Sequence, residues 1–184
     1  MIKENAKLIL REVDQVLSLV DQSQVETLIS AILDANNIVV CGAGRVGMAI
    51  RGFGMRLGHL GFKAHTLGDS TVPGIGKGDL FLVASGSGET QTIYDLVEIG
   101  WNDVVMVGLV TGNPESRMGK LADVLVQISA PSKTKAVEGL VSIQPMTTLN
   151  EQSLGIFFDA LVLDLMEKMG ETHDTMWARH SNLE

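Results

Sequence analysis

Cysteine and positive charge are both scarce in this sequence. The single cysteine, Cys41, excludes an internal disulfide and a cysteine-rich metal site, and at the end of an apolar segment it is expected to be a small core residue. The 14 basic residues are outnumbered by 22 acidic ones, which leaves a formal net charge of −8. Non-specific nucleic-acid binding needs a basic face, so we expect no nucleic-acid partner. His, Asp and Glu residues show no metal-site spacing, so we expect no metal.

Long apolar runs are also missing. The first apolar stretch is interrupted by charged residues, namely Lys3, Glu4, Lys7, Arg11 and Glu12. We therefore expect no signal peptide, and no other stretch reaches the length needed to cross a membrane. With 45% hydrophobic and 20% charged residues, the composition is that of an ordinary globular protein with a substantial core. We expect a cytoplasmic protein with no membrane partner.

What the sequence does contain is an alternation of short apolar strands and amphipathic helices. We expect strands over residues 37–41, 63–67, 79–84, 103–110 and 123–128. We expect helices over residues 3–20, 24–35, 46–60, 92–99 and 148–169, with a short one near Pro114. Ser23 and Glu26 are predicted to form a capping box for the second helix, and Gly61 to cap the third.

Strands separated by helices pair in parallel through right-handed crossovers, which indicates an α/β sandwich. No internal repeat, low-complexity segment or linker divides the chain, so we expect a single domain over residues 1–184. Its parts are N-terminal helices over 1–36, a strand and helix core over 37–129, and a C-terminal helix and tail over 148–184. Ligands of such folds bind at the carboxyl ends of the strands.

A hydroxyl-rich loop follows the strand expected over 79–84. Its sequence is Ser85-Gly86-Ser87-Gly88-Glu89-Thr90. The glycines let the backbone turn tightly and bring its N–H groups close to a ligand, while the serines and the threonine add hydroxyl donors. The dipole of the following helix favours negative charge, and the loop contains no Lys or Arg. A phosphate bound here would be held by neutral donors, although an ordinary strand-to-helix turn with serine caps also fits.

A second glycine-rich loop follows the first strand. Gly42-Ala43-Gly44-Arg45-Val46-Gly47 matches the G-x-G-x-x-G fingerprint, and Asp69 could supply the acidic residue expected about 20 positions later. A nicotinamide or flavin nucleotide site is therefore an alternative. Against it, the chain leaves no length for a separate substrate domain, and the hydroxyl-rich loop would stay unused. Arg45 could instead contact a substrate oxygen or phosphate, or cap neighbouring carbonyls.

Together, the two loops and the end of the chain resemble the sugar isomerase (SIS) family, and within it the 6-phospho-3-hexuloisomerases. The matching segments are residues 42–45, 55–62, 85–90, 143–146, 151–152 and 180–184. The serine loop is general to SIS domains. Gln144-Pro145-Met146 and the tail His180-Ser181-Asn182-Leu183-Glu184 indicate the hexuloisomerases, whose tail typically reads His-Ala-Asn-Leu-Glu.

The resemblance implies an SIS-type three-layer α/β/α sandwich with a five-stranded parallel sheet. It implies a homotetramer in which neighbouring subunits complete each site, with a small-molecule sugar phosphate as ligand and no cofactor or metal. The implied reaction interconverts D-arabino-hex-3-ulose 6-phosphate and D-fructose 6-phosphate, a step of formaldehyde fixation in the ribulose monophosphate pathway. An arabinose 5-phosphate-type aldose–ketose isomerase and a non-catalytic phosphosugar-binding module remain alternatives.

Such a reaction moves a proton between C2 and C3 through an enediolate, and a carboxylate is the natural base. Glu151 stands at the start of the last long helix, whose positive end favours a carboxylate. With the resemblance, we predict that Glu151 takes the proton from C2 and returns it at C3. From sequence alone, it could merely satisfy the first turn of its helix. Arg45 is the candidate to stabilise the enediolate or orient the substrate.

Histidine titrates near neutral pH, which suits proton transfer between the two oxygens. His59 and His180 are the candidates, although His59 could also be the dipole partner at the end of its helix. His180 lies in a polar tail that could dock on a neighbouring subunit. The predicted catalytic residues are Glu151, His59 and His180. The residues predicted to bind substrate and phosphate are Arg45, Ser85, Gly86, Ser87, Gly88 and Thr90.

Overall fold

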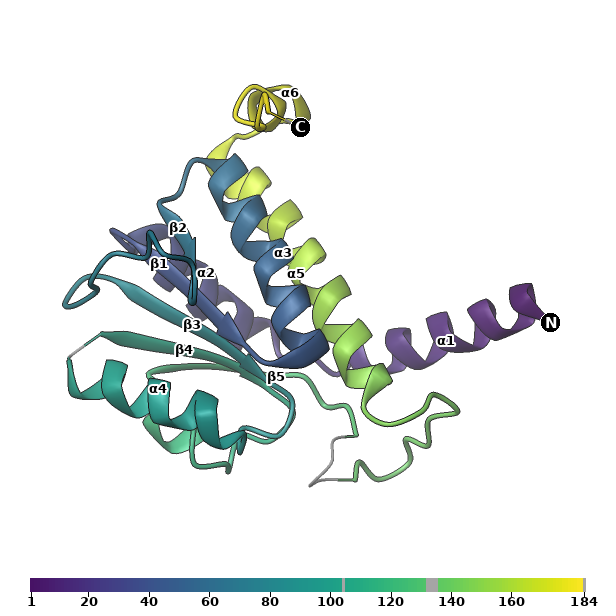
Figure 1. Cartoon of the computed structure of the whole chain (residues 1–184). Coiled ribbons are helices and arrows are strands. Elements are labelled where there is room, and N and C mark those ends of the chain that lie inside the picture. The colour runs from purple at the N-terminus through teal and green to yellow at the C-terminus, as the bar shows by residue number, and fades with distance from the viewer. Residues whose placement is uncertain (104, 132–135, 184) are drawn as a thin grey trace.

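The computed structural model describes residues 1–103, 105–131 and 136–183. Five parallel strands form one sheet in the order β2-β1-β3-β4-β5 (Figure 1). The strands are β1 Ile38–Gly42, β2 Ala64–Thr66, β3 Leu80–Ser85, β4 Met106–Thr111 and β5 Val124–Gln127. The expected strands and their parallel pairing are confirmed. Val104 of one expected strand and Glu184 of the tail lie outside the described residues.

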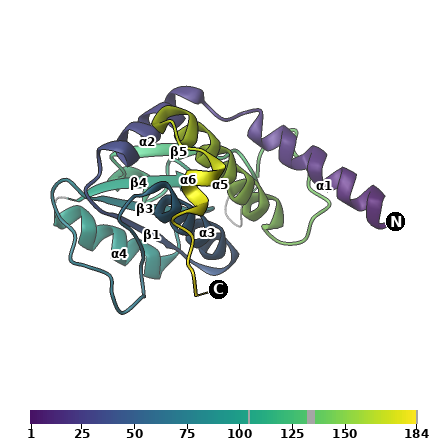
Figure 2. The ribbon, with the colours of Figure 1, turned by 90° about the horizontal axis from the view of Figure 1, so that it is seen from above.

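Helices cover both faces of the sheet, which confirms the predicted three-layer sandwich (Figure 2). One face carries α2 Gln22–Asp34, α3 Gly44–Leu60 and α5 Thr148–Met169, together with the end of α1 Ile2–Leu17. The other face carries α4 Gln91–Asn102. Because both faces are covered, every residue of β3 is buried, and its sequence is apolar almost throughout.

Glycine fixes both ends of α3. The helix ends at Gly61 as predicted, and the φ of +98° there is a left-handed conformation that glycine adopts easily. At its start, a Cβ on Gly47 would lie 2.5 Å from the carbonyl oxygen of Gly42. The first turn of α3 can therefore pack directly against the end of β1. The predicted bounds of α5, residues 148–169, are also confirmed.

Two local predictions were wrong. The N-cap of α2 is Asp21 in place of Ser23, because the Asp21 carboxylate accepts from the backbone N–H and the hydroxyl of Ser23, at 2.8 and 2.7 Å. The helix expected near Pro114 is a series of turns that ends in a single 3₁₀ turn, Gly119–Leu121. There the hydroxyl of Ser116 accepts from the N–H of Gly119 at 3.1 Å, which takes a donor that an α-helix would use.

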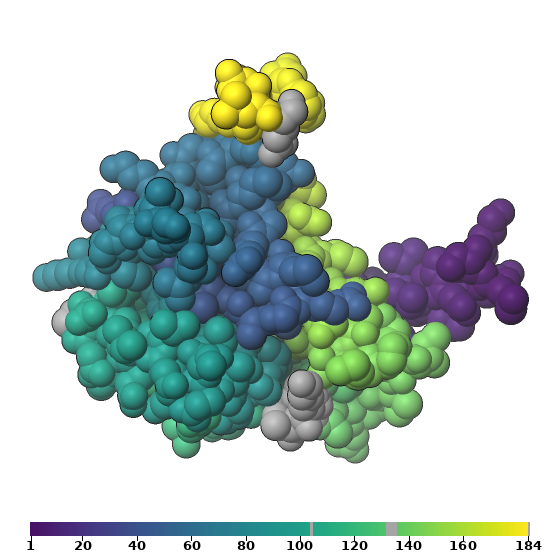
Figure 3. All heavy atoms as spheres, viewed as in Figure 1, coloured from purple at the N-terminus to yellow at the C-terminus, as the bar shows by residue number. Residues whose placement is uncertain are grey.

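The first ten residues of α1 project from the body of the molecule (Figure 1, Figure 3). None of them is buried, and the side chains of Ile2 and Leu10 are 80% and 61% exposed. Burial begins at Glu12 and Val13, where the helix contacts α5. In the described ranges, no helix combines the length and the apolar character required to span a membrane.

Burial decides the chemistry of Cys41 near the end of β1. The residue is buried in the layer between the sheet and α4, among apolar side chains. Burial raises the pKa of its thiol to about 11. The thiol is therefore protonated at neutral pH and is not a nucleophile, which confirms Cys41 as a core residue.

The tail folds back onto the end of α3 through α6 His173–Trp177 (Figure 1). Arg179 makes the connection: its guanidinium donates two hydrogen bonds to the Glu171 carboxylate, both at 2.9 Å, and one to the carbonyl of His59 at 3.0 Å. The hydroxyl of Thr175 also donates to Glu171. Arg179 foremost, and Thr175 after it, lower the pKa of the Glu171 carboxyl to about 2.

We expect the tail to detach as the pH falls from about 4.5 to about 2. The pKa of Glu171 is about 2 in the folded chain, against 4.5 for an unperturbed glutamate. The ionised Glu171 therefore stabilises the docked tail fully above pH 4.5. This stabilisation is lost at lower pH as protonation removes the anionic partner of Arg179. Fluorescence of Trp177 in a Trp101→Phe protein reports the change, because the Trp177 ring stacks on His180 with centroids 4.9 Å apart.

Glu171→Gln is the control for this titration. Its Trp177 emission at pH 6 should already be that of the detached tail and should not change between pH 4.5 and 2. Identical emission of the two proteins at pH 6 would contradict the assignment of Glu171 as the residue that holds the tail.

Candidate active site

Arg45 and Glu151, two of the predicted site residues, form an ion pair at the carboxyl edge of the sheet. Arg45 lies in the first turn of α3, directly after β1, and Glu151 lies in the first turn of α5. The Arg45 Nε is 3.0 Å from the Glu151 Oε2. The hydroxyl of Thr147 donates to the other oxygen, Oε1, at 3.0 Å. Both carboxylate oxygens therefore have a partner, which holds the carboxylate in one orientation.

The two partners differ in exposure. The side chain of Arg45 is 54% exposed, whereas that of Glu151 is 16% exposed. Solvent screens a pair of this kind, so it contributes at most about 1 kcal/mol to stability. A ligand can therefore replace Glu151 as the partner of Arg45 at little cost, while the carboxylate stays in its sheltered position.

The loop over residues 85–90 joins β3 to α4. Ser85 is buried, and its Oγ accepts from the N–H of Gly88 at 3.1 Å, so it braces the loop. The Oγ of Ser87 accepts from the N–H of Glu89 at 3.2 Å, which leaves the hydroxyl hydrogen available to donate. Thr90 is the N-cap of α4, but its exposed side chain makes no capping bond to the described start of that helix. Ser87 and Thr90 therefore offer the more accessible hydroxyls.

Two glycines place this serine loop against its neighbours. Gly88 has a φ of +64°, and a Cβ there would lie 2.0 Å from the hydroxyl of Ser116. A Cβ on Gly86 would lie 2.4 Å from the amide oxygen of Asn150, which directly precedes Glu151. On the other side, β1 pairs with β3 up to their carboxyl ends, just before Arg45. The structure thus brings the serine loop, Arg45 and Glu151 together.

Sequence reasoning missed a cation beside the serine loop. Arg117 donates from Nε to the Glu89 carboxylate at 2.7 Å and from Nη2 to the Glu89 carbonyl at 3.1 Å, and it lies 4.3 Å above the ring of Tyr94. The hydrogen bond from Arg117 lowers the pKa of the Glu89 carboxyl, and Glu89 raises the pKa of Arg117. Because Glu89 neutralises this cation, the loop still presents mainly neutral donors.

Buried polar groups gather at the start of α5. Asn150 and Ser153 are 1% and 0% exposed, and the amide atoms of the first and the hydroxyl of the second have no hydrogen-bond partner among the described residues. The same holds for the amide oxygens of Gln144 and Gln152. Buried polar groups almost always have partners, so this end of α5 suits a polar ligand or bound water. Asn150 was missed from sequence, where the available indication was an amide on the apolar face of a helix.

The two predicted catalytic histidines lie together, but far from Glu151 of the same chain. His59 is in the last turn of α3, His180 follows α6, and their ring centroids are 5.2 Å apart. Arg45 lies at the other end of α3, so a rise of about 1.5 Å per residue puts it about 20 Å from His59. Arg56 also approaches this pair, with its Nη1 3.2 Å from the Nδ1 of His59. One chain therefore does not bring the histidines to the carboxylate.

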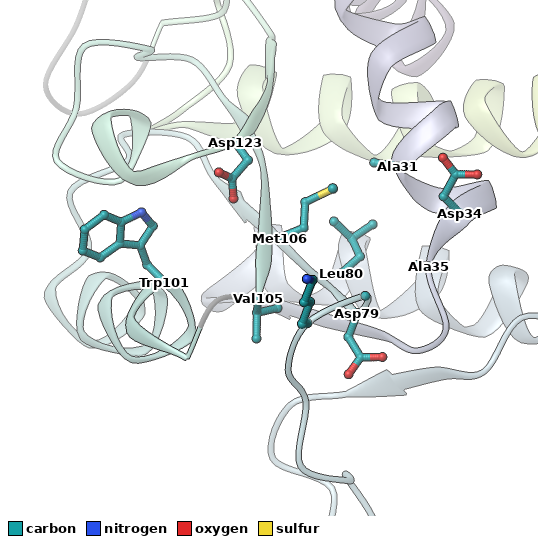
Figure 4. Close-up of a pocket in the computed structure, with 11 residues that line it drawn as sticks. Ala31, Asp34, Ala35, Asp79, Leu80, Trp101, Val105, Met106 and Asp123 are labelled. Carbon is teal, nitrogen blue, oxygen red and sulfur yellow. The ribbon is translucent and has the colours of Figure 1, made fainter.

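A cavity of about 520 Å³ lies at the opposite edge of the sheet, beside the first residues of β3 and β4 (Figure 4). Its lining is mainly apolar and includes Trp101, with the carboxylates of Asp34 and Asp123 among the polar groups. Asp79 and Lys77 also line the cavity, so three carboxylates stand against one ammonium group. This negative excess repels a phosphate ester, and the serine loop is the better candidate site. Within the described ranges, no group of three or more His, Cys, Asp or Glu side chains could hold a metal ion.

Known proteins resemble the chain along nearly its full length. Residues 31–154 match the SIS domain family. A 3-hexulose-6-phosphate isomerase of Bacillus subtilis is 38% identical over 176 residues, which cover 96% of this chain and 95% of that protein. One of Mycobacterium gastri is 37% identical over 183 residues, which cover 100% of this chain and 92% of that protein.

A solved structure agrees with these matches. It is a protein of Methanococcus jannaschii whose crystal structure infers a function as 3-hexulose-6-phosphate isomerase. It superposes with a TM-score of 0.85 at 25% identity and covers 98% of this chain and 99% of its own. The match over residues 31–154 and the near full-length relatives confirm what the two loops indicate: the chain belongs to the SIS domain family.

Proposed function

We propose that the protein is a phosphosugar isomerase that interconverts D-arabino-hex-3-ulose 6-phosphate and D-fructose 6-phosphate. The observation that carries the proposal is the carboxylate of Glu151, held 3.0 Å from Arg45 beside the hydroxyl-rich loop. The Bacillus and Mycobacterium relatives named 3-hexulose-6-phosphate isomerase support the 3-ketose as substrate. The step belongs to formaldehyde fixation by the ribulose monophosphate pathway.

The carbonyl moves from C3 to C2 through an enediolate. Glu151 takes the proton from C2, the electron pair of that bond forms the C2–C3 double bond, and the oxygen on C3 becomes negative beside Arg45. Return of the proton to C3, with transfer of the hydroxyl proton from the oxygen on C2 to the oxygen on C3, gives fructose 6-phosphate. A 3-ketose phosphorylated on O6 cannot close a furanose ring through that oxygen, so the forward reaction needs no ring-opening group.

The phosphate is assigned to the serine loop. The hydroxyls of Ser87 and Thr90 and the N–H groups at the start of α4 are the donors, and the positive end of the helix favours the charge. Gly86 and Gly88 allow the close approach of the loop to its neighbours, and Ser85 braces it. This use of the loop favours a phosphosugar over the dinucleotide considered from the G-x-G-x-x-G pattern.

The proton transfer between the two substrate oxygens is assigned to His59 or His180 of a neighbouring chain. About 20 Å separates the ends of α3, so histidines at one end can serve only a carboxylate that another chain supplies. We therefore include a homotetramer in the proposal, and no cofactor or metal. Because a phosphate ester does not cross a membrane, the enzyme would work in the cytoplasm, where the ester is made.

We expect Glu151→Gln to abolish isomerisation while leaving sugar-phosphate binding largely intact. The amide cannot accept a proton from C2, so kcat should fall by about 10²–10⁴-fold, the typical contribution of a general base. Turnover is measured with fructose 6-phosphate, and binding by calorimetry. Asp159→Asn, an exposed change on the same helix, is the matched control and should keep full activity. Full turnover by Glu151→Gln would remove Glu151 as the base.

We expect Ser87→Ala to weaken binding of fructose 6-phosphate by about tenfold to a hundredfold. A hydrogen bond to a charged group contributes about 1.5–3 kcal/mol, and each 1.4 kcal/mol is about a factor of ten in Kd. Calorimetry with the sugar phosphate and with unphosphorylated fructose separates the phosphate contact from the rest. Ser30→Ala, which removes an exposed hydroxyl from α2, is the control. An unchanged affinity of Ser87→Ala for fructose 6-phosphate would count against the phosphate assignment.

A further inference from the structure

Glu12 is a buried carboxylate that the proposed chemistry does not use. It lies on α1, is 8% exposed, and accepts hydrogen bonds from three consecutive residues. The donors are the hydroxyl of Ser142 at 2.7 Å, the N–H of Ile143 at 2.9 Å and the side-chain amide of Gln144 at 3.0 Å. Burial raises the pKa of the Glu12 carboxyl, but these hydrogen bonds outweigh the rise, so its pKa lies below the usual value and the group is ionised at neutral pH.

Hydrogen bonds continue from this segment to the carboxylate of Glu151. The carbonyl of Pro145 accepts from the N–H and the hydroxyl of Thr148, at 3.2 and 2.7 Å. The carbonyl of Thr147 accepts from the N–H of Glu151 at 3.1 Å. The hydroxyl of Thr147 donates to Oε1 of Glu151 at 3.0 Å. A short stretch of chain thus joins Glu12 to Glu151 and is restrained at both ends.

The middle of this stretch has a strained backbone. Met146 has a φ of +57°, and in the described chain it is the sole non-glycine residue with a positive φ. A residue with a Cβ enters this region at a cost of about 1–2 kcal/mol. Its side chain is 89% exposed, so packing of that side chain does not impose the conformation. Strain of this kind persists only where the surroundings enforce it, and the bonds to Glu12 and to Thr148 are the restraints on either side.

We propose that Glu12 is a positioning residue for the isomerase: it holds segment 142–147 in the strained geometry that aims the carboxylate of Glu151. The inference rests on the proposed role of Glu151 as the base. A carboxylate accepts from all three partners at once, whereas a glutamine keeps one acceptor oxygen for the N–H of Ile143 and requires the hydroxyl of Ser142 and the amide of Gln144 to turn and accept. Hydrogen bonds to an ionised acceptor are also about twice as strong as neutral ones.

Glu12→Gln tests the proposal through the split between kcat and KM for fructose 6-phosphate. A displacement of about 1 Å at a reacting group can reduce the rate about a hundredfold, so we expect kcat to fall by about tenfold to a hundredfold. KM should stay nearly unchanged, because no hydrogen bond joins this stretch to the serine loop among the residues that the structure describes. Asp14→Asn, an exposed change on the same helix, is the control with unchanged kcat. An unchanged kcat of Glu12→Gln, or a rise in KM alone, overturns the proposal.

Hydrogen exchange gives a readout that does not depend on activity. Glu12→Gln should speed exchange of the N–H groups of Ile143 and Glu151, while that of Tyr94 at the start of α4 keeps its rate. Equal rates at Ile143 and Glu151 in the two proteins would show that Glu12 does not restrain the segment. If the unmodified protein does not isomerise the sugar, the proposed function fails. If it does and only Glu12→Gln is without effect, the positioning role alone fails.

A second substitution separates positioning from a general loss of stability. Met146→Asn in the Glu12→Gln protein should restore part of kcat, because asparagine tolerates the left-handed conformation better than methionine does. Lost stability elsewhere would give no such recovery, and an absence of recovery contradicts the role assigned to the strain. Should Glu12→Gln fail to fold, Ser142→Ala removes one of the three bonds to Glu12, together with the bond that the Ser142 hydroxyl accepts from the N–H of Gln144, and should lower kcat to a smaller extent. An unchanged kcat there overturns the proposal.

Discussion

The ion pair between Arg45 and Glu151 depends on two helices that begin at the same edge of the sheet. α3 starts directly after β1, and α5 packs along it through the stacked rings of Phe53 and Phe158, with centroids 4.9 Å apart. Both helices therefore point their positive ends toward the carboxyl edge, where the serine loop also begins a helix. The starts of α3 and α5 and the guanidinium of Arg45 thus meet at the carboxylate, and the serine loop lies against Asn150 beside it, which suits a reaction of an anionic sugar that passes through an enediolate.

The length of α3 that creates this pair also separates it from the two histidines. His59 stands at the far end of the helix, and Arg179 ties the tail with His180 to that same end. Under the proposed mechanism, a chain therefore offers a base at one end of α3 and acid–base groups at the other. The proposed mechanism therefore requires assembly of chains to bring them together, and it assigns the placement of His180 to the tail that Glu171 holds.

Local patterns in the sequence predicted much of the fold, because buried strands, amphipathic helices and glycine caps each have a recognisable pattern within a few consecutive residues. The five strands, the end of α3 at Gly61 and the bounds of α5 belong to this class. Contacts between segments that are distant in the sequence have no such local pattern. The ion pair of Arg117 with Glu89 and the hydrogen bond from the Gln144 amide to the Glu12 carboxylate could not be predicted, since the sequence around one partner does not indicate the other. The N-cap of α2 was misassigned because Asp21 and Ser23 are both favourable N-cap residues. In the structure, the Asp21 carboxylate caps the helix by accepting from the N–H of Ser23.

The central claim is that this site moves a carbonyl between C3 and C2 by removing a carbon-bound proton. The most direct test is to incubate the protein with fructose 6-phosphate in deuterated water and to locate the deuterium by NMR. A base that works through the C2–C3 enediolate exchanges the hydrogen on C3, and we predict deuterium at that position. Deuterium at C1 without any at C3 would indicate an aldose–ketose isomerase, and it would contradict the account.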